Sequence, residues 1–553
     1  MKKSIRSRLK LYPWSSLLAG TELLKSQNGQ NQRRRYRVEE SELRLRAAVA
    51  RLLEAGFQIS PTTLDMLRSQ RDPGSVVNRF LAENKLQPSQ ASILEPHHFA
   101  SDTATRSEEK PESEDVRSVL ASTGQQETTV VPQKTEVRLE VLRDPTPELA
   151  SQGTLEEFVA NFQDRYRRLR QIITQRVDGK GVVDIRDLAA GVRKGPDERS
   201  STTKVVGLVA SKAQTKSGNL VLDLEDLTGR ARVIVQGKEN ALMKKAAPVL
   251  LDQVVCVEGT AVNAEMLIAK DIFLPDVPAT RHMARANEDV SVVLISDIHY
   301  GSKQFLETVF KRFLHWLQGR EGDEEQVRMA GTVKYLVIAG DLVDGIGVYP
   351  NQLEDILIHD YYDQYAGLAK LLQEIPDYIH VIVTPGNHDA VRNALPRPAM
   401  DPTFLEPFKE AGLSMTSLGC PCELSLHGVD LLVYHGDSLI DVMGALSKPE
   451  LEAGFVAMRE LLRGRHLAPI YGKSTTICPE RRDWLVIDHV PDILHCGHIH
   501  VNSAGSYRKT LIVNSGTFQS QTEYQRSIGI EPTPGIVPLV NLRTLSVKTL
   551  TFA

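Results

Sequence analysis

The spacing of apolar residues changes along the chain, and its first period is helical. Leu43, Ala47 and Leu52 fall on one face of a helix, and Asp72-Pro73 is typical of the start of another. Residues 1–94 are therefore predicted to form a basic arm and a small helical module. The arm holds Arg33, Arg34, Arg35 and Arg37, which are either solvated or contact nucleic acid or a partner.

The periodicity is lost over residues 95–150, which are rich in Ser, Thr, Glu and Asp and poor in apolar residues. Such a segment cannot offset the entropy lost on ordering, so we expect a flexible linker there. Apolar side chains then return at helical spacing, with Leu155, Phe158 and Phe162 on one face. A helical connector is predicted over residues 151–198.

The next region has the short, alternating runs of β-strands. KVVGLVA, NLVLDLED, ARVIVQ and QVVCVEGTAV are separated by turn residues such as Ser217-Gly218-Asn219. Strands of this kind over residues 199–280 suit a small OB-fold barrel. A small β domain without a binding role is the alternative, because a fold does not establish a function.

From residue 289 to residue 553, strand-like runs alternate with longer helical stretches, which indicates an α/β domain. The chain of 553 residues is too long for a single core. The predicted architecture is therefore multidomain α+β: a helical module, a linker, a connector, an OB-fold and a C-terminal α/β sandwich.

Composition excludes a few classes of protein. The net charge of −4 gives no global basic excess, although nucleic-acid binding needs only a local basic surface. The five cysteines include no CxxC pair, so a reducing, cytoplasmic location is expected rather than a disulfide framework. Pro13 interrupts the N-terminal apolar stretch, and no membrane span is expected.

Polar clusters follow the strand-like runs of the C-terminal domain, where ligand sites form in open α/β sheets. A lone His-x-His is more often incidental than a ligand pair, but matching clusters at other strand ends favour a ligand site. The clusters are Asp297-Ile298-His299, Gly340-Asp341-Leu342-Val343-Asp344, Gly386-Asn387-His388-Asp389, His435-Gly436-Asp437 and Gly497-His498-Ile499-His500.

Oxygen and imidazole donors without a thiolate suit Mn²⁺, Fe²⁺ or Zn²⁺ better than Ca²⁺. The number of donors is too large for one ion and suits two ions bridged by one carboxylate. In extended backbone, residues i and i+2 point to the same side, so Asp297 with His299, and His498 with His500, would each aim at one centre.

The motifs D-x-H, GDxxD, GNHD, HG and GHxH, in this order, resemble those of the calcineurin-like metallophosphoesterases. The resemblance implies hydrolysis of a phosphate ester by a water that attacks phosphorus in line. It implies that His388 acts as general acid and that Asp344 orients it. One metal would be bound by Asp297, His299, Asp341 and His500, and the other by Asp341, Asn387, His435 and His498.

The residues that flank these motifs distinguish between families within this superfamily. Protein phosphatases of this superfamily carry other residues where this chain has Gly345 and Asp389. An OB-like domain directly before the core resembles the small subunits of replicative DNA polymerases. The segments SDIHYGS, AGDLVDGIGVYP, TPGNHDAVR, HLAPIYG, VNSGTFQSQTEYQ and LEDLTGRARVIV are similar to those of the small subunit of the archaeal D-family DNA polymerase.

This second resemblance implies a 3′–5′ exonuclease that proofreads DNA for a separate large catalytic subunit. Two divalent ions are expected, with Mn²⁺ favoured over Fe²⁺ or Zn²⁺. The expected partners are the large subunit and single-stranded DNA 3′ ends, with the sliding clamp as a further candidate.

Two other functions stay open at this point. One is a scaffold with little catalysis, since eukaryotic relatives of this kind have lost metal ligands. The other is a stand-alone nuclease or phosphodiesterase, although such nucleases carry their additional domains after the core. Arg392, Arg397 and Lys473 are either contacts to the DNA backbone or ordinary surface charges, and Asn514, Ser515 and Gly516 are either pocket wall or turn.

Overall fold

A computed structural model describes residues 135–191, 202–446 and 453–553, with short stretches at 58–59, 67, 76–77 and 93–94. The four arginines of the predicted arm and most of the predicted helical module and linker lie outside the described residues. Residues 13–124 form a compact unit distinct from the rest of the chain. In this unit β1 (Gln58–Ile59) pairs in parallel with β2 (Ile93–Leu94), a pairing that the helical pattern did not predict.

A closed barrel of five strands follows the connector. The strands run in the order β5-β6-β7-β9-β8, and β8 pairs back onto β5. The apolar positions of these strands alternate inward and fill the barrel, as in β7, where Ala231, Val233 and Val235 are buried. The bounds are β5 (Thr202–Gln214), β6 (Leu220–Glu225), β7 (Arg230–Val235), α6 (Asn240–Ala246), β8 (Val254–Asn263) and β9 (Met266–Phe273).

The barrel begins earlier than the sequence predicts. β4 (Val182–Val183) pairs in parallel with β5, and the 3-10 helix η3 (Ile185–Gly191) follows it. Ile185 and Leu188 are buried among the barrel's own core residues. The predicted connector over residues 151–198 is therefore wrong in its last part, because these two side chains complete the barrel core.

Helix α5 (Leu155–Gln175) is the helix predicted near residues 154–176, and a capping box between Thr154 and Glu157 fixes its start. One face of the helix, including Phe162 and Leu169, packs against β5 and β8 of the barrel. The same helix also contacts the C-terminal domain through the buried Arg165, whose Nε lies 2.7 Å from Asp483 Oδ2. α5 therefore connects the barrel with the C-terminal domain.

The C-terminal domain contains two six-stranded sheets, in the orders β13-β12-β11-β10-β19-β20 and β17-β18-β16-β15-β14-β3. The first consists of β10 (Ser291–Ile295), β11 (Val333–Ala339), β12 (His380–Thr384), β13 (Met415–Ser417), β19 (Ile536–Asn541) and β20 (Val547–Thr551). The second consists of β3 (Leu139–Arg143), β14 (Cys422–Leu426), β15 (Val429–Val433), β16 (Ile493–Cys496), β17 (Asn502–Tyr507) and β18 (Thr510–Ser515).

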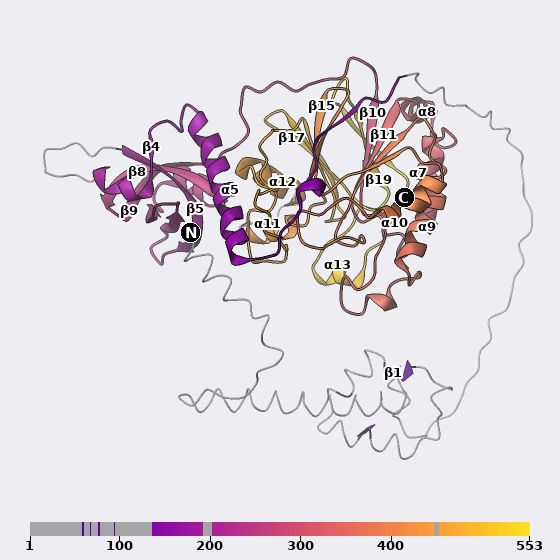
Figure 1. Ribbon diagram of the computed structural model, residues 1–553, viewed down its shortest axis with the longest axis horizontal. Helices are drawn as coiled ribbons and strands as arrows, with labels where there is room; N and C mark the ends of the chain where they lie inside the picture. The colour runs from indigo at the N-terminus through magenta and orange to yellow at the C-terminus, as the bar shows by residue number, and fades with distance from the viewer. Residues whose placement is uncertain are drawn as a thin grey trace, which may run out of the picture. The chain divides into compact units, whose positions relative to one another are not determined.

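The two sheets pack face to face, because alternate residues of their strands belong to different cores. In β10, Val292 and Leu294 pack against the second sheet, whereas Val293 and Ile295 pack against helices. On that helical side lie α7 (Glu307–Leu317), α8 (Glu324–Ala330), α9 (Tyr361–Leu372) and α10 (Pro402–Glu410). Helices α11 (Leu439–Ala445) and α12 (Ala453–Gly464) cover the second sheet (Figure 1). The domain is thus a four-layer sandwich with helices outside and sheets inside.

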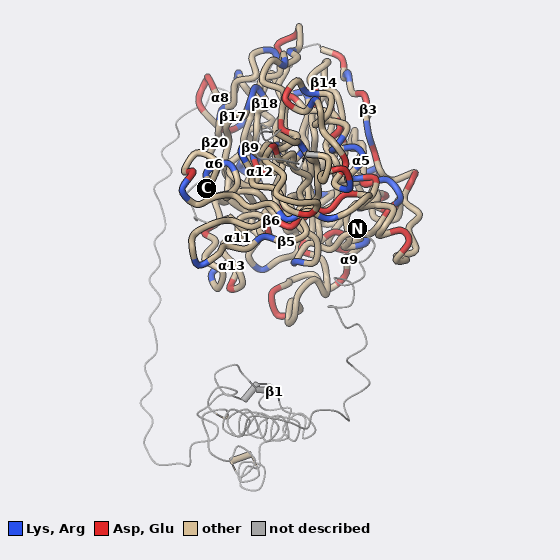
Figure 2. Tube along the Cα trace, turned by 90° about the vertical axis from the view of Figure 1, so that its left-hand side faces the viewer, with Lys and Arg blue, Asp and Glu red and all other residues tan. Residues whose placement is uncertain are grey.

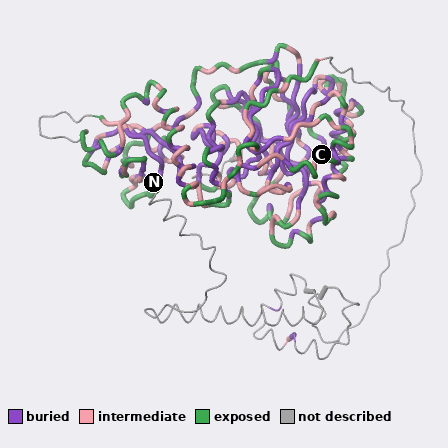
Figure 3. The backbone as a smooth tube through the Cα atoms, in the orientation of Figure 1, coloured by how far each residue is buried: buried purple, intermediate pink, exposed green. Residues whose placement is uncertain are grey.

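The distribution of buried residues agrees with this layering. Buried positions concentrate along the strands, and exposed positions lie mainly at the periphery (Figure 3). Lys and Arg are interspersed with Asp and Glu over the described elements, as Figure 2 shows. None of the helices in the described part of the chain has the length and apolar character needed to cross a bilayer.

Strand β3 corrects the linker prediction. It pairs antiparallel with β14, and η2 (Thr146–Glu148) follows it. The segment alternates apolar and polar residues from Val137 onward, but the polar stretch before it dominated the composition of the whole window. Residues 139–148 are therefore part of the sandwich, and the predicted flexible linker over residues 95–150 is wrong at this end.

Candidate metal centre

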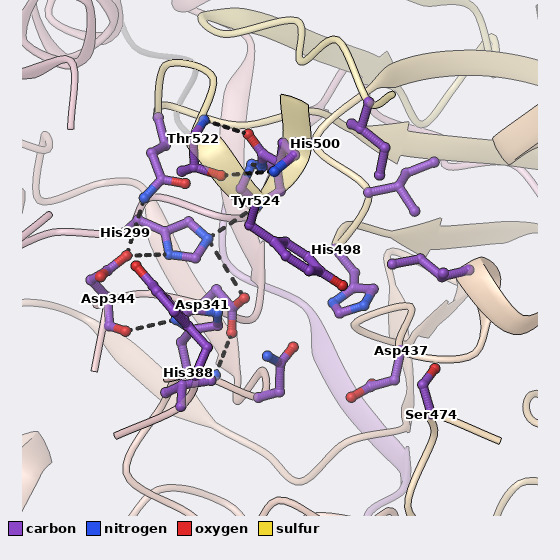
Figure 4. Close-up of a pocket in the computed structure, with 18 of the residues that line it drawn as sticks. His299, Asp341, Asp344, His388, Asp437, Ser474, His498, His500, Thr522 and Tyr524 are labelled. Atoms are coloured by element: carbon purple, nitrogen blue, oxygen red, sulfur yellow. Dashed lines mark hydrogen bonds and ion pairs between the residues drawn. The ribbon is translucent and has the colours of Figure 1, made fainter. Parts of the chain in front are cut away.

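The carboxyl ends of strands from both sheets meet at one cavity of about 430 Å³. The cavity is lined by His299, Asp341, Asp344, Asn387, His388, His498 and His500 (Figure 4). The two other predicted site residues, Asp297 and His435, are completely buried beside these side chains. The structure thus brings all nine predicted residues together.

Around His299 lies one group of ligand atoms. Its Nε2 is 3.1 Å from His500 Nε2 and 3.6 Å from Asp341 Oδ2. His500 Nε2 is 3.3 Å from Asp297 Oδ1. These atoms belong to the four residues that the resemblance assigned to one metal.

Around His435 lies a second group. Its Nε2 is 3.0 Å from Asn387 Oδ1, 3.1 Å from His498 Nδ1 and 3.3 Å from Asp341 Oδ2. Asp341 therefore takes part in both groups with the same oxygen. This is the position that a bridging carboxylate requires.

For His435 and His299, the hydrogen bond made by Nδ1 determines that Nε2 is the ring nitrogen that faces the centre. His435 Nδ1 lies 2.8 Å from the carbonyl oxygen of Ala339 and can only donate to it. His299 Nδ1 lies 2.9 Å from Asp344 Oδ1 and donates likewise. Both Nε2 atoms face carboxylate oxygens. Burial alone would lower the pKa of His435, but Asp341 raises it to about 10, so His435 Nε2 carries a proton that a bound cation would replace.

Other features of the donor set fit divalent cations. Asp297 Oδ1 is buried, and the polar atom beside it is His500 Nε2 at 3.3 Å. Burial, together with the neighbouring His435, lowers the pKa of His498 to about 4, which keeps the ring in its neutral, ligating form. Burial alone would raise the pKa of Asp341, but His435 and His388 hold it well below the usual range.

Left-handed backbone, rather than extended strand, aims the ligand pairs. The φ angle is 52° at Asp297, 52° at His299, 70° at His498 and 58° at His500. Non-glycine residues rarely adopt this conformation, which costs on the order of 1–3 kcal/mol each and clusters at functional sites. The expectation of extended backbone at these pairs is wrong, because β10 and β16 end before them.

The contact between His388 and Asp344 also differs from the expectation that the Asp344 side chain orients His388. His388 Nδ1 lies 2.6 Å from the main-chain carbonyl oxygen of Asp344. The Asp344 carboxylate instead contacts His299 Nδ1 and the amides of Gln352 and Gln519. Asp344 therefore touches both histidines, one through its main chain and one through its side chain.

Several residues at the site were not predicted from the sequence. Asp389 accepts from the main-chain N–H groups of Leu342 and Gly386, and so ties together two motif loops. Burial beside Asp341 raises the pKa of Asp389 to about 6. The amide Nε2 of Gln525 lies 2.6 Å from His500 Nδ1. The only sequence signal for this glutamine was its place in the segment FQSQTEYQ.

The candidate DNA-contacting arginines have other partners. Arg397 is fully buried, and its Nη1 lies 3.0 Å from Asp437 Oδ2, so it is not a surface charge. Arg392 contacts the carbonyl oxygen of Pro396 and the carboxylate of Glu480, whereas Lys473 is exposed.

The candidate wall residues lie behind the motif loops. Asn514 donates to the carbonyl oxygen of Gly497 at 2.8 Å, and Ser515 Oγ lies 2.7 Å from Ser296 Oγ. Both residues are buried and neither lines the cavity. They hold the loops that carry Asp297 and His498.

Comparison with known proteins identifies the family. The family model that describes the B subunits of DNA polymerases alpha and epsilon matches residues 292–504. A DNA polymerase II small subunit from Methanothermobacter thermautotrophicus is 35% identical over 89% of this chain and 97% of its own length. The corresponding protein of Archaeoglobus fulgidus is 39% identical over 72% of this chain and 78% of its own.

A third relative extends beyond the region that aligns with this chain. The DNA polymerase II small subunit of Pyrococcus furiosus is 40% identical over 72% of this chain, and the match spans 64% of that protein. The chain therefore belongs to the family of archaeal DNA polymerase II small subunits, which are the small subunits of the D-family DNA polymerases.

Proposed function

We propose that the chain carries a two-metal 3′–5′ exonuclease that removes nucleotides from DNA 3′ ends and proofreads for a large catalytic subunit. The observation that carries the proposal is the convergence of possible ligand atoms on Asp341, whose Oδ2 lies 3.3 Å from His435 Nε2 and 3.6 Å from His299 Nε2. A subunit with a purely structural role has no need of this convergence, since burying ionisable groups costs free energy.

The architecture supports the same proposal. The four-layer sandwich with its centre at the strand ends is the arrangement expected of a calcineurin-like phosphoesterase. The barrel has the strand order β5-β6-β7-β9-β8, closed by β5 with β8, and α6 lies between β7 and β8. We assign it as an OB-fold, in agreement with the expectation from the sequence.

One group of residues around His299 and one around His435 would each hold a divalent cation, with Mn²⁺ expected. Bound there, the two cations would neutralise charge on the phosphodiester and activate the attacking water. Asp341 would contact both cations, and Asp344 would hold the ring of His299 through its carboxylate.

His388 would supply the proton. Its Nδ1 donates to the carbonyl oxygen of Asp344, so Nε2 is the atom that exchanges a proton with the substrate. As the water oxygen forms a bond to phosphorus, the bond from phosphorus to the 3′ oxygen of the preceding nucleotide breaks. The leaving oxygen takes the proton from His388 Nε2, the attacking water gives up one proton to solvent, and a nucleoside 5′-monophosphate is released.

A scaffold role is the second candidate, and the family match over residues 292–504 favours it. The two roles are compatible, because a chain can bind the large subunit with one surface and hydrolyse DNA at another. The names of the relatives favour association with a large subunit over a stand-alone nuclease. We propose the large subunit as partner, with the sliding clamp as a further candidate.

The test uses the full chain, alone and with its large subunit, on a 5′-labelled DNA strand with a mismatched 3′ end. With Mn²⁺, the wild type should shorten the strand one nucleotide at a time. His388→Ala should slow this by about 10²- to 10⁴-fold. The control His489→Ala changes an exposed histidine outside the centre and should leave the rate unchanged.

Metal binding and association separate the two candidate functions. Calorimetric titration with Mn²⁺ should give two ions for the wild type and a clear loss of binding for Asp341→Ala. Asp341→Ala should still co-purify with the large subunit. Failure of the wild-type complex to shorten the strand at any Mn²⁺ concentration would leave only the scaffold role.

A further inference from the structure

Helix α13 (Glu523–Ser527) and its C-cap residue Ile528 place two exposed apolar side chains at the cavity. Tyr524 is 63% exposed and Ile528 is 44% exposed, and both line the cavity that contains the metal ligands. Residues four apart share one side of a helical turn, so the two side chains form one surface. Figure 4 shows Tyr524 among the labelled residues of the centre. Grouped exposed apolar side chains beside a cavity mark a contact surface.

The same helix is fixed to the metal centre. Gln525 is only 8% exposed, and its Nε2 lies 2.6 Å from Nδ1 of His500. A capping box between Thr522 and Gln525 holds the first turn, with N-to-O distances of 3.2 and 3.0 Å. Because Tyr524 directly precedes Gln525, the position of its backbone relative to the centre is fixed.

The charges at the cavity exclude recognition of the DNA backbone by cationic side chains there. Among the described residues that line it, the charged ones are Asp341, Asp344, Asp355 and Asp437, and none is Lys or Arg. Beyond the two cations, a DNA strand can gain affinity in the cavity from neutral hydroxyl and amide groups, such as those of Ser474 and Asn393, and from contacts with its bases. An aromatic ring is the side chain that supplies such contacts without regard to sequence.

The size of the cavity limits what can enter. A volume of about 430 Å³ lies within the range of small-molecule sites, about 300–1,000 Å³, and leaves room for one terminal nucleotide. A base that enters must first leave its complementary strand, and an unpaired or mismatched base does so at the lowest free-energy cost.

We propose that Tyr524, supported by Ile528, stacks on the terminal base of an unpaired DNA 3′ end and thereby selects unpaired over paired ends. The inference rests on the proposed nuclease function, since it names the substrate class of that same centre and the residue that recognises it. Tyr524 is a specificity-determining residue in this assignment and takes no part in the transfer of the proton.

The test measures binding separately from turnover. A single-stranded oligonucleotide with 2-aminopurine as its 3′ base is titrated with the full chain carrying His388→Ala, in the presence of Mn²⁺. Stacking on Tyr524 should quench the fluorescence. Adding Tyr524→Ala should abolish the quenching and weaken binding by about 5- to 150-fold. Tyr524→Phe keeps the ring and should bind like the parent.

Tyr362→Ala is the matched control, because Tyr362 is also exposed, at 42%, and does not line the cavity. It should leave binding and quenching unchanged. In the active chain, Tyr524→Ala should raise KM for single-stranded ends with little change in kcat. It should also reduce the preference for mismatched over paired ends.

The outcomes distinguish this inference from the proposed function. Quenching that depends on Tyr524 in a chain that never hydrolyses DNA would support the inference while the nuclease proposal fails. Hydrolysis with the same quenching and KM in Tyr524→Ala would overturn the inference alone. It would also be overturned if the chain did not bind the labelled end, or if Tyr524→Ala instead released the large subunit.

Discussion

At the scale of single residues, two histidines of the centre each have one ring nitrogen that already donates a hydrogen bond to a neighbouring oxygen. His435 donates to Ala339 O at 2.8 Å, and His299 donates to Asp344 Oδ1 at 2.9 Å. Each ring is therefore held in one orientation and turns its Nε2 atom toward Asp341. The strain of the left-handed backbone at the ligands is tolerated because surrounding contacts fix it.

Close packing behind Asp341 gives a prediction. A Cβ atom at Gly386 would lie 2.1 Å from Asp341 Oδ1 and 2.6 Å from its main-chain nitrogen. Gly386→Ala must therefore displace the Asp341 carboxylate, and for the proposed two-metal centre we expect the affinity for Mn²⁺ to fall by about 10- to 100-fold in calorimetric titration.

Gly444→Ala is the matched control for this substitution. Gly444 lies in α11, and a Cβ atom there would meet nothing within 4 Å. Its alanine variant should bind Mn²⁺ like the wild type and be no less stable, since alanine favours a helix. Equal Mn²⁺ affinities of the two variants would contradict this account of the site.

The convergence of the candidate ligand residues could be expected from the sequence, because each lies in a short motif directly after an apolar run. The residues that support them could not. Gln525 reaches His500 across 25 residues, and Gln519 reaches Asp344 across 175. Contacts of this range depend on how the loops fold back, which no local pattern encodes. Arg397 looked like a surface charge for the same reason, since its partner Asp437 is 40 residues away.

At the scale of elements, α5 is held on the C-terminal domain by a buried polar group. Arg165 Nε and His466 Nε2 both donate to Asp483 Oδ2, at 2.7 and 3.0 Å. Burial alone would raise the pKa of Asp483, but Arg165 and His466 hold it far below its usual value. The helical spacing of apolar residues predicted α5. It did not predict the contact with Asp483, because Arg165 occupies a polar position of that pattern.

Removal of the arginine should be strongly destabilising. Arg165→Ala leaves the buried carboxylate of Asp483 without its ion-pair partner, which typically costs about 3–5 kcal/mol. Arg167→Ala changes an exposed arginine of the same helix that contacts only Gln163 and should cost far less. The midpoints of urea unfolding followed by circular dichroism compare the two, and equal midpoints would show that the ion pair does not hold the helix.

The same group predicts a loss of stability in acid. Burial, with a contribution from Arg165, lowers the pKa of His466 to about 4 from 6.5. The folded state therefore resists protonation that the unfolded state accepts. The stabilisation is complete above pH 6.5 and is lost as the pH falls toward 4, by at most about 3 kcal/mol.

His466→Gln isolates this effect, because glutamine can donate to Asp483 but does not titrate. The decrease in thermal midpoint between pH 7 and pH 4 should be smaller in this variant than in the wild type. Parallel pH profiles would mean that other buried groups cause the acid sensitivity.

At the scale of the whole molecule, the sandwich is assembled from two separated parts of the chain. β3 precedes α5 and the barrel in sequence, yet it forms the edge of the second sheet beside β14. Arg143 fixes this strand further, since its Nη1 lies 2.9 Å from Glu423 Oε1 and 2.9 Å from Val486 O. Changes in hydrophobic period indicated the strands of the barrel and the alternating elements after it, whereas a lone strand of five residues such as β3 gave no comparable signal.

Two truncated chains test the role of this strand. A chain that begins at residue 135 keeps β3 and should unfold at the same temperature as the full chain. A chain that begins at residue 151 exposes the edge of β14 and should unfold at a lower temperature and aggregate. Light scattering during a thermal ramp measures both, and equal behaviour of the two chains would contradict the role of β3.

The position of β3 also has a consequence during synthesis. Arg143 and its partner Glu423 are 280 residues apart. A ribosome adds about 5 to 20 residues each second, so β3 is made roughly 15 to 60 s before β14. During that interval α5 and the barrel can complete their local contacts, while β3 waits without a neighbouring strand. The first strand of the sandwich to be translated is thus the one that waits longest for its neighbouring strand, and over that time it is open to chaperones.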